Sequence, residues 1–320
     1  MTVNTRNVSS IDLKHLRYFV GVVDAGSLSR AAQRLHIVQP ALSNRMSALE
    51  QYLGTLLLHR TPSGVRPTEA GKILYASATR ILRELQSVAD ELAVLSSAPV
   101  GSVRFGCSPS TSTVLAKPLI DAVIQKLPHV RFSFVCAAST DIYQRLLRGD
   151  LDLALIYKDG AVPGVTGTPL VRENMFLVAS AEDPRFQNME AISAQRASEF
   201  DLVLATQSRY FGTEVIHDRF LAAGVRLRVV AQIDSVDALF DMLAPGGAVS
   251  IIPWAACAQR ERAGSIRVVP VSGIDLWRVL DFCVPSEHPL TPAAEAVASL
   301  ARSVVAQLIG AGSWRHAECI

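Results

Sequence analysis

Hydrophobic side chains in the first 55 residues recur at the spacing of three short helices. The apolar face of the first helix repeats at three- and four-residue steps: Leu13, Leu16, Phe19, Val20 and Val23. Gly26 ends this helix, and Ser27 stands at the N-cap of a short second one. Gln39 and Pro40 open a third helix, because proline in a first turn costs no hydrogen bond. Its inward-facing residues follow at steps of four, three and four: Leu42, Met46, Leu49 and Leu53.

A basic hairpin is predicted directly after the third helix. The segment LLLHRTPSGVRPTEAG is typical of a strand, a tight turn around Pro62 to Gly64, and a return strand. Arg60 and Arg66 stand on either side of this turn. Thr68 is then the expected N-cap of the next helix.

The helix that follows carries one continuous apolar seam. Its members alternate at steps of four and three: Leu74, Ala78, Ile81, Leu85, Val88, Leu92 and Leu95. Such a seam requires a partner helix, and at 1.5 Å per residue the helix would run about 40 Å. The alternative is a helix packed on its own domain. A linker from Ser96 to Pro99 is expected to end it.

Beyond Pro99 the chain alternates between predicted strands and helices. The strands VRFGCS, VRFSFVCA and LDLALIY are separated by helices at about 113–126 and 142–148. This order predicts a parallel sheet with helices on both faces. A second set begins near Met175 with MFLVAS, DLVLAT, LRVVAQI and AVSIIP, and has helices near 211–223 and 236–243. WRVLDFCV and a helix at about 292–308 close the chain, so we expect two α/β halves with a cleft between them.

Composition and charge narrow the class of protein. A chain of 320 residues with 49% hydrophobic and 19% charged residues is long enough for two or three domains with real cores. Residues 1–72 carry nine Lys or Arg against four Asp or Glu, whereas residues 73–320 carry 22 against 25. The basic character therefore lies in the first quarter, which favours a polyanion partner for that part.

Membrane, secretory and metal classes find no support in the sequence. Prolines and glycines interrupt the longest apolar stretch, Met242 to Ala258, which we expect to be a buried core segment. The N-terminal residues lack a secretory signal, so we expect a cytoplasmic protein without a membrane partner. The five cysteines are scattered and form no CxxC pair, which speaks against disulfides and a structural zinc site.

The outer side of the third helix has the chemistry of major-groove reading. It presents amide and hydroxyl side chains together with a proline: Gln39, Pro40, Ser43, Asn44 and Ser47. Gln and Asn can pair with adenine, proline can touch a thymine methyl group, and serine can hold a phosphate. The alternative is the ordinary solvated surface of a helical hairpin.

The run from Gly26 to Gly71, GSLSRAAQRLHIVQPALSNRMSALEQYLGTLLLHRTPSGVRPTEAG, strongly resembles the winged helix-turn-helix of the LysR-type transcriptional regulators. The framework elements AA, L, QPALS, LE..LG, R and T.AG follow one another in this order and are intact. PHVRFSFV, LLRGDLDLAL and PGGAVSIIP extend the resemblance more loosely, and HIVQPALS and AGKILYA are similar to the branch that contains nitrogen assimilation control proteins.

This resemblance implies a homo-oligomeric, sequence-specific regulator that binds double-stranded DNA at a partly dyad-symmetric operator. It implies DNA contacts from the third helix, the backbone-contacting serines and the wing: Gln39, Pro40, Ser43, Asn44, Ser27, Ser29, Arg60 and Arg66. It assigns dimerisation to the long helix: Leu74, Ile81, Leu85, Val88, Leu92 and Leu95. Val38 replaces a serine common in the family, and Asn44 an arginine, so a phosphate contact and one base preference are expected to differ.

The expected fold class is α/β with an N-terminal all-α winged helix-turn-helix. A long linker helix joins it to a C-terminal two-lobed effector domain like the periplasmic binding proteins. Expected bounds are 11–68 for the DNA-binding domain, 69–98 for the linker helix and 99–310 for the effector domain. Its lobes would take about 99–170 plus 271–310, and 171–270. Homodimer and homotetramer both stay open, as do activation and repression, and RNA polymerase is a further candidate partner.

Polar residues after three of the predicted strands are the candidates for effector binding. Ligands of such sheets bind beyond the carboxyl ends of the strands, at helix N-termini that offer free N–H groups. The expected residues are Ser108, Ser110, Thr111, Ser139, Thr140, Thr206 and Gln207. Their hydroxyls suit a small carboxylate or another small anion, whereas the alternative role is helix capping.

The sequence fits two other classes of function less well. An enzyme finds no support, because GCSPS lacks the second glycine of a nucleophile elbow and neither GxGxxG nor GKS/T occurs. The histidines show no HxxxH or HExxH spacing, so we expect no catalytic residue, cofactor or metal. A transport-type solute receptor fits the C-terminal part alone, but the missing signal sequence and the basic first quarter of the chain contradict it.

Overall fold

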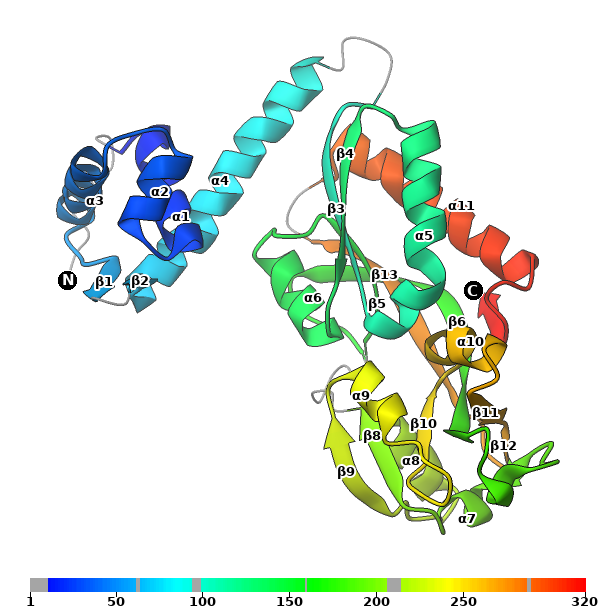
Figure 1. Ribbon diagram of the computed structural model, residues 1–320. Coiled ribbons are helices and arrows are strands. Elements are labelled where there is room, and N and C mark those ends of the chain that lie inside the picture. Colours follow the sequence, from blue (N-terminus) through cyan, green and yellow to red (C-terminus); the bar gives the residue numbers. More distant parts are fainter. Residues whose placement is uncertain (1–10, 62–63, 94–98, 159, 206–213, 287–288) are drawn as a thin grey trace. The chain divides into compact units, whose positions relative to one another are not determined.

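Within the described residues, four helices and a two-stranded hairpin build the N-terminal unit of the computed structural model (Figure 1). The structure describes residues 11–61, 64–93, 99–158, 160–205, 214–286 and 289–320. Contacts divide the chain into two units, residues 1–95 and 96–320. The N-terminal elements are α1 (Leu13–Ala25), α2 (Leu28–Arg34), α3 (Gln39–Leu53), β1 (Leu58–Thr61), β2 (Gly64–Pro67) and α4 (Glu69–Ala93). The three predicted helices and the predicted hairpin strands are therefore present.

The buried face of α1 differs from the predicted one. Leu16 and Phe19 are buried as expected, but Leu13 is 40% exposed and Val22, which the prediction left out, is fully buried. At 100° per residue, Leu13 and Val20 lie roughly 100° to 120° around the helix from Phe19, whereas Val22 lies roughly 60° from it. The core of the unit is centred on Phe19, so the buried stripe of α1 is rotated about the helix axis relative to the predicted stripe.

Thr68 caps α4, as the sequence predicted. Its Oγ1 accepts a hydrogen bond from the Gly71 N–H at 3.0 Å and donates one to the Leu56 carbonyl at 2.7 Å. The first turn of α4 lies so close to the hairpin that a Cβ on Gly71 would stand 2.1 Å from the Leu57 carbonyl oxygen. Only glycine fits there, which explains the residue at this position of the TEAG segment.

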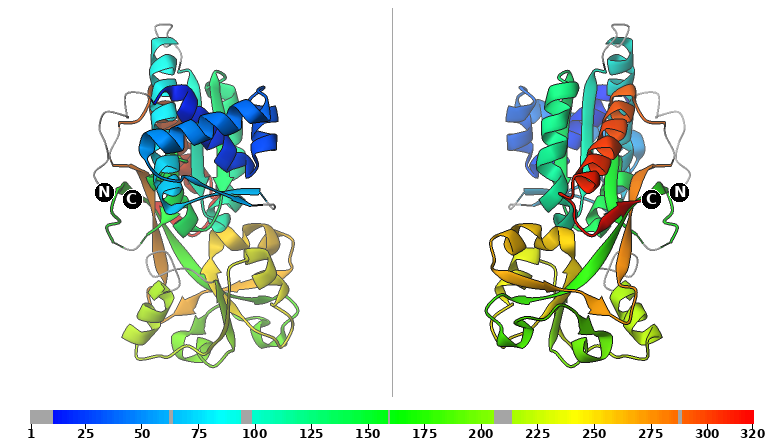
Figure 2. Two further views of the ribbon diagram at one scale, coloured as in Figure 1. Left: turned by 90° about the vertical axis from the view of Figure 1, so that its left-hand side faces the viewer. Right: turned by 90° about the vertical axis from the view of Figure 1, so that its right-hand side faces the viewer.

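The second unit begins with the predicted parallel βαβαβ arrangement. Its elements are β3 (Gly101–Cys107), α5 (Pro109–Lys126), β4 (Val130–Cys136), α6 (Ser139–Leu147) and β5 (Leu153–Tyr157). Strand β3 lies between β4 and β5 and is parallel to both. Helices α5 and α11 (Pro292–Gly310) lie side by side on one face of this sheet, and α6 covers the other (Figure 2).

Two long antiparallel strands extend this sheet into the second lobe (Figure 1). They are β6 (Val165–Ser180) and β13 (Trp277–Pro285), in the order β10-β6-β13-β5-β3-β4. The sequence predicted a strand only from Met175, whereas β6 begins at Val165. The missed half contains glycine, proline and adjacent charges, which are typical of loops. It pairs with β13, and the other half pairs with β10 and β11.

The second lobe holds the remaining elements. They are η2 (Pro184–Phe186), β7 (Ile192–Ser193), α7 (Ala194–Ala197), β8 (Leu202–Ala205), α8 (Glu214–Ala222), β9 (Val229–Ile233), α9 (Val236–Asp241), β10 (Ser250–Pro253), α10 (Trp254–Arg262), β11 (Ile266–Val269) and β12 (Val271–Ser272). A last short strand, β14 (Ala317–Cys319), pairs with β6. Residues 250–258 are buried throughout, which confirms the second half of the predicted core segment, although its α10 was not predicted as a helix. The first half is not core, because Met242 and residues 244–246 are exposed.

Helix α11 is, within the described part of the chain, the one helix long and apolar enough to cross a membrane by length and composition alone. Its inner face is buried against the sheet: Ala294, Val297, Ala301, Val304 and Val305. This is the arrangement of a core helix.

Candidate nucleic-acid interface and effector site

Helices α2 and α3 form a tight pair joined by a strained turn. Ser27 caps α2 by accepting a hydrogen bond from the Arg30 N–H at 3.4 Å. Ala31 and Ala32 are buried and allow α3 to approach closely. In the turn, His36 has a φ of 54°, a left-handed conformation that side chains other than glycine seldom adopt. The turn reverses the chain within four residues, so the first turn of α3 projects from the surface of the N-terminal unit, which we call the head.

The predicted reading residues lie on the open side of α3. Gln39, Pro40 and Asn44 are exposed, and Ser43 is half-buried. Ser29 is exposed on α2. The opposite side of α3 is anchored by Leu42, Met46 and Leu49, which are all buried.

The hairpin next to α3 holds the two predicted wing arginines in different ways. Arg66 is exposed on β2. Arg60 instead reaches back to α3, where its Nη1 donates to the Ser43 Oγ at 3.0 Å and its Nη2 to the Ser47 Oγ at 3.4 Å. The structure thus brings Arg60 and Ser43 together, a contact that no local pattern in the sequence predicts.

Glu50 fixes the hairpin to α3. Its carboxylate accepts hydrogen bonds from the N–H groups of Leu57 at 2.9 Å and Leu58 at 3.2 Å. A second carboxylate oxygen lies 3.7 Å from the Arg60 guanidinium. This side chain is the glutamate of the LE..LG framework, but its role in positioning the wing was not predicted.

Helix α4 divides its predicted seam between two environments. Leu74 packs against the core of the head and Ala78 is fully buried, so these positions are occupied within the unit itself. Ile81, Leu85 and Val88 are 41%, 47% and 47% exposed. The side chain of Leu92, and Leu95 altogether, lie outside the described residues. The exposed stripe is therefore shorter than the seam.

The first two predicted effector clusters lie together at one edge of the sheet. Because Cys107 and Cys136 are register partners on parallel strands, the segments that follow β3 and β4 leave at the same edge. Ser108, Ser110 and Thr111 are 4%, 7% and 0% exposed, Ser139 is 2% exposed, and Thr140 is half-buried. Thr206 and Gln207 lie outside the described residues.

The hydroxyls at the start of α5 bind one another and do not cap the helix. Ser108 is the N-cap residue, yet its side chain makes no capping hydrogen bond. Its Oγ lies 3.1 Å from the Ser110 Oγ and 3.0 Å from the Thr111 Oγ1. Ser139 is the first residue of α6, where Ala138 takes the N-cap position. The alternative role as helix caps is thus not the one that Ser108 and Ser139 take.

A buried ion pair stands directly behind these hydroxyls. Arg278 of β13 and Glu173 of β6 are register partners, with Nη2 and Oε1 2.5 Å apart. The Arg278 Nη2 also donates to the Ser110 Oγ at 2.9 Å, and the Trp314 Nε1 donates to the Glu173 Oε2 at 3.2 Å. The strands that join the two lobes are therefore hydrogen-bonded to the candidate effector site. Sequence reasoning missed both charged residues.

A second ion pair lies at the end of β5. Lys158 and Asp281 are 2.8 Å apart, and their side chains are 11% and 8% exposed. Gly167 makes room for them, because a Cβ there would stand 2.3 Å from the Lys158 Cε and 2.7 Å from the Asp281 Oδ2. This pair holds β5 and β13 near the edge where the hydroxyls lie.

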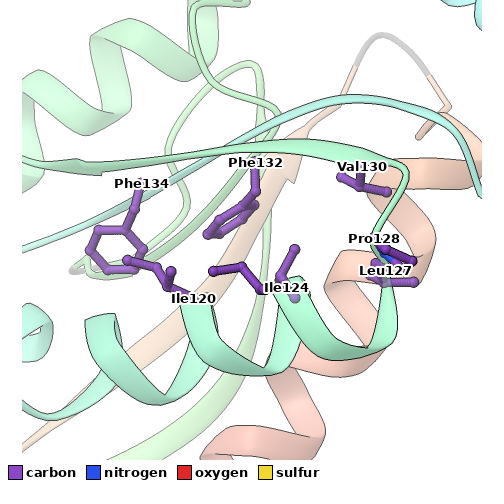
Figure 3. A pocket seen from close by; sticks show the side chains of 8 residues that line it. Ile120, Ile124, Leu127, Pro128, Val130, Phe132 and Phe134 are labelled. Carbon is purple, nitrogen blue, oxygen red and sulfur yellow. The ribbon is translucent and has the colours of Figure 1, made fainter.

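A groove of about 380 Å³ between α5 and β4 has a different chemistry (Figure 3). The side chains that line it are all apolar: Ile120, Val123, Ile124, Leu127, Pro128, Val130, Phe132 and Phe134. It lies along the last strand of the sheet order, towards the far end of α5 from Ser108. These side chains suit an apolar partner and carry no hydrogen-bonding group for an anion. Within the described ranges, no group of His, Cys, Asp and Glu is arranged to hold a metal ion.

Comparison with known proteins connects both units to one family. Residues 13–72 match the bacterial regulatory helix-turn-helix protein, lysR family, and residues 96–306 match the LysR substrate binding domain. The chain is 30% identical to the nitrogen assimilation regulatory protein nac of Klebsiella aerogenes, over 93% of this chain and 96% of that one.

Two solved structures share the fold. A full-length OxyR variant from Pseudomonas aeruginosa matches with a TM-score of 0.71 at 24% identity, covering 92% of this chain and 94% of that one. Full-length CbnR in complex with its target DNA also matches with a TM-score of 0.71, at 21% identity, covering 92% and 100%. The predicted winged helix-turn-helix and two-lobed α/β architecture are thus confirmed. The two family matches and the 30% identical relative confirm a regulatory, non-enzymatic class of protein. The chain belongs to the LysR family of DNA-binding transcriptional regulators.

Proposed function

We propose that α3 reads base edges in the major groove and that the hairpin contacts the adjoining DNA backbone. The observation that carries this proposal is the row of exposed Gln39, Pro40 and Asn44 on the open side of α3. Arg66 is exposed on the neighbouring strand, and Ser27 and Ser29 stand near the start of α2, where they suit phosphate contacts. Ser43 and Arg60 would reach DNA as one hydrogen-bonded pair.

Selection of bound sequences from a random DNA pool tests this proposal. A dyad-symmetric motif is expected, and Gln39→Ala should weaken binding to it by roughly 1 to 3 kcal/mol while nonspecific binding stays nearly unchanged. Gln51→Ala is a matched control, because Gln51 is exposed near the far end of the same helix. An equal loss on all sequences would mean that Gln39 only positions the head.

The hydroxyl cluster at the start of α5 is the proposed binding site for a small carboxylate or another small anion. Ser108, Ser110 and Thr111 leave the first N–H groups of an 18-residue helix without a side-chain cap. Such N–H groups favour negative charge. Ser139 and Thr140 would join this site, as would Thr206 and Gln207 from the other lobe.

Calorimetric titration with a panel of small carboxylates tests the effector site. Ser108→Ala should abolish the heat of any carboxylate that binds. Ser112→Ala should retain it, because the Ser112 hydroxyl already donates to the Pro109 carbonyl at 2.7 Å. Equal binding by both variants would place the ligand elsewhere.

Ligand binding at this edge is proposed to change the angle between the lobes and thereby the spacing or bending imposed on DNA. β6 and β13 pass from one lobe to the other, and Arg278 on β13 is bonded to Ser110 of the site. The effector would bias a two-state equilibrium. Identical DNA footprints with and without a ligand that calorimetry shows to bind would count against this mechanism.

The exposed stripe of α4 supports self-association. Ile81, Leu85 and Val88 present apolar surface on one side of a helix that ends outside the core of its unit. Leu85→Asp with Val88→Asp should yield monomers in sedimentation velocity. Ile73→Asp is the control, because this exposed residue lies roughly 80° around the helix from Ile81. A stable oligomer of the double variant would refute the stripe.

Homodimer and homotetramer are the two assemblies proposed for this stripe. Sedimentation velocity on the unaltered chain distinguishes them by mass. We place the protein in the cytoplasm, where its DNA partner is, with RNA polymerase as a candidate second partner.

A further inference from the structure

Val38, the residue before Gln39, contributes little to the stability of the free protein. It is the N-cap of α3, with φ −78° and ψ 138°, and its side chain makes no capping hydrogen bond. Serine, threonine, asparagine and aspartate stabilise this position, whereas valine is among the poorest N-caps. Ser27 shows the usual solution at the start of α2.

The Val38 side chain is also left in water. It is 69% exposed, and its apolar neighbours Pro40 and Ala41 are exposed as well. Burial stabilises a valine in proportion to the area removed from water, and Val38 lacks most of that stabilisation. Val38 therefore departs from two local preferences, because it is a poor N-cap and an apolar side chain exposed to water. Positions that depart from such preferences are typically functional ones.

The chemistry of the major groove supplies an apolar counterpart. Among the groups that base pairs present there, the C5 methyl of thymine is the one methyl group, and most of the others are hydrogen-bond donors and acceptors. Val38 carries two methyl groups, and Gln39 and Pro40 follow it at once along the chain. A helix that places Gln39 on a base edge therefore brings Val38 to the neighbouring base or to its sugar.

We propose that Val38 determines specificity by contacting the methyl group of a thymine beside the base that Gln39 reads. The inference rests on the proposed placement of α3 in the major groove. It extends that proposal by assigning an apolar DNA contact to the N-cap residue of α3, which lacks a capping hydroxyl. Contact with a deoxyribose instead would give affinity without sequence preference.

Replacement of thymine by uracil tests the contact, because uracil lacks only the C5 methyl group. The tightest site selected from a random pool is synthesised with one thymine at a time changed to deoxyuridine. Binding of the full chain is then measured by fluorescence anisotropy. The wild-type protein should lose roughly fourfold to tenfold in affinity at one thymine of each half-site. Val38→Ala should bind the thymine site about as weakly as wild type binds the uracil site, with no further loss on the change to uracil.

Two further variants separate the contact from folding and from general apolar exposure. Val38→Ser supplies the missing capping hydroxyl, so it should fold at least as well as wild type and still be insensitive to uracil. Leu56→Ala removes another exposed apolar side chain of the head, which is 68% exposed, and should behave like wild type on both sites.

The outcomes distinguish failure of this inference from failure of base reading by α3. If uracil weakens wild type and Val38→Ala equally at every thymine, the methyl contact belongs to another residue. If Val38→Ala weakens all sequences alike, the side chain touches the sugar, and the inference is again overturned. If the full chain selects no sequence from the pool, base reading by α3 fails and this inference fails with it.

Discussion

Replacing Glu173 by glutamine removes one negative charge from a position without access to water. The side chain is fully buried, and its Oε1 accepts from Arg278 through Nε at 2.6 Å as well as through Nη2. Its Oε2 accepts from the Trp314 Nε1. Glutamine offers one acceptor oxygen and one NH₂ group, so the NH₂ must face either Arg278 or Trp314, which are both donors.

The expected loss of stability follows from the charge of Arg278, which stays buried after the change. Removing one partner of a buried ion pair typically costs 3 to 5 kcal/mol, because the other charge remains buried without compensation. We therefore expect Glu173→Gln to lower the free energy of unfolding of the C-terminal unit by about 3 to 5 kcal/mol. Glu173→Leu combined with Arg278→Met removes both charges, so it should recover most of this loss.

Equilibrium unfolding in urea, followed by tryptophan fluorescence, measures the effect on the correct unit. All three tryptophans, Trp254, Trp277 and Trp314, lie within residues 96–320, so unfolding of the head is silent in this signal. Glu182→Gln, an exposed glutamate of the same unit, should change stability by less than about 0.5 kcal/mol. A loss below about 1 kcal/mol for Glu173→Gln would refute the buried pair.

Three further predictions concern other parts of the C-terminal unit. Hydrogen bonds from Arg185 hold the pKa of the Asp183 carboxyl below its usual 3.8. The difference in free energy of unfolding between wild type and Asp183→Asn should therefore be constant from about pH 5 to 8 and should shrink as the pH falls below 3.8 through the folded-state pKa. A difference that widens in acid would contradict this. Iodoacetamide should modify the native protein at the exposed thiols only, by mass spectrometry, because burial raises the pKa of the Cys283 thiol to about 12 and raises that of Cys107 as well. The expected sites are Cys136 and Cys319. Gly167→Ala should cost about 1 to 3 kcal/mol in the same urea assay by displacing Lys158, whereas Gly310→Ala, which meets no neighbour, should cost nothing.

Short-range patterns were sufficient to predict most of the elements. The apolar residues of α3 and the alternation of β3, α5 and β4 are local signals, because each repeats within one element. The predicted cap at Thr68 and the proline near the start of α3 are local in the same way. These features gave the fold class and the position of the reading helix from the sequence alone.

Contacts between distant segments had no such signal. Arg278 meets Ser110 across 168 positions of sequence, and no periodicity in either segment marks that encounter. The first half of β6 was missed because Gly167 and Pro169 are typical of turns, yet pairing with β13 outweighs their local preference. Arg60 was expected to contact DNA, and its hydrogen bonds to Ser43 depend on how closely the hairpin packs against α3.

The shared strands of the two lobes have a consequence for synthesis on the ribosome. β13 pairs with β5 inside the first lobe, yet roughly 120 residues of chain separate Tyr157 from Trp277. At roughly 5 to 20 residues per second, the edge of β5 waits about 6 to 24 s for its neighbour. During that time an apolar strand that is fully buried in the finished protein has an unpaired edge. The head is complete long before, so a nascent chain can carry a folded DNA reader while its regulatory unit still requires protection from aggregation.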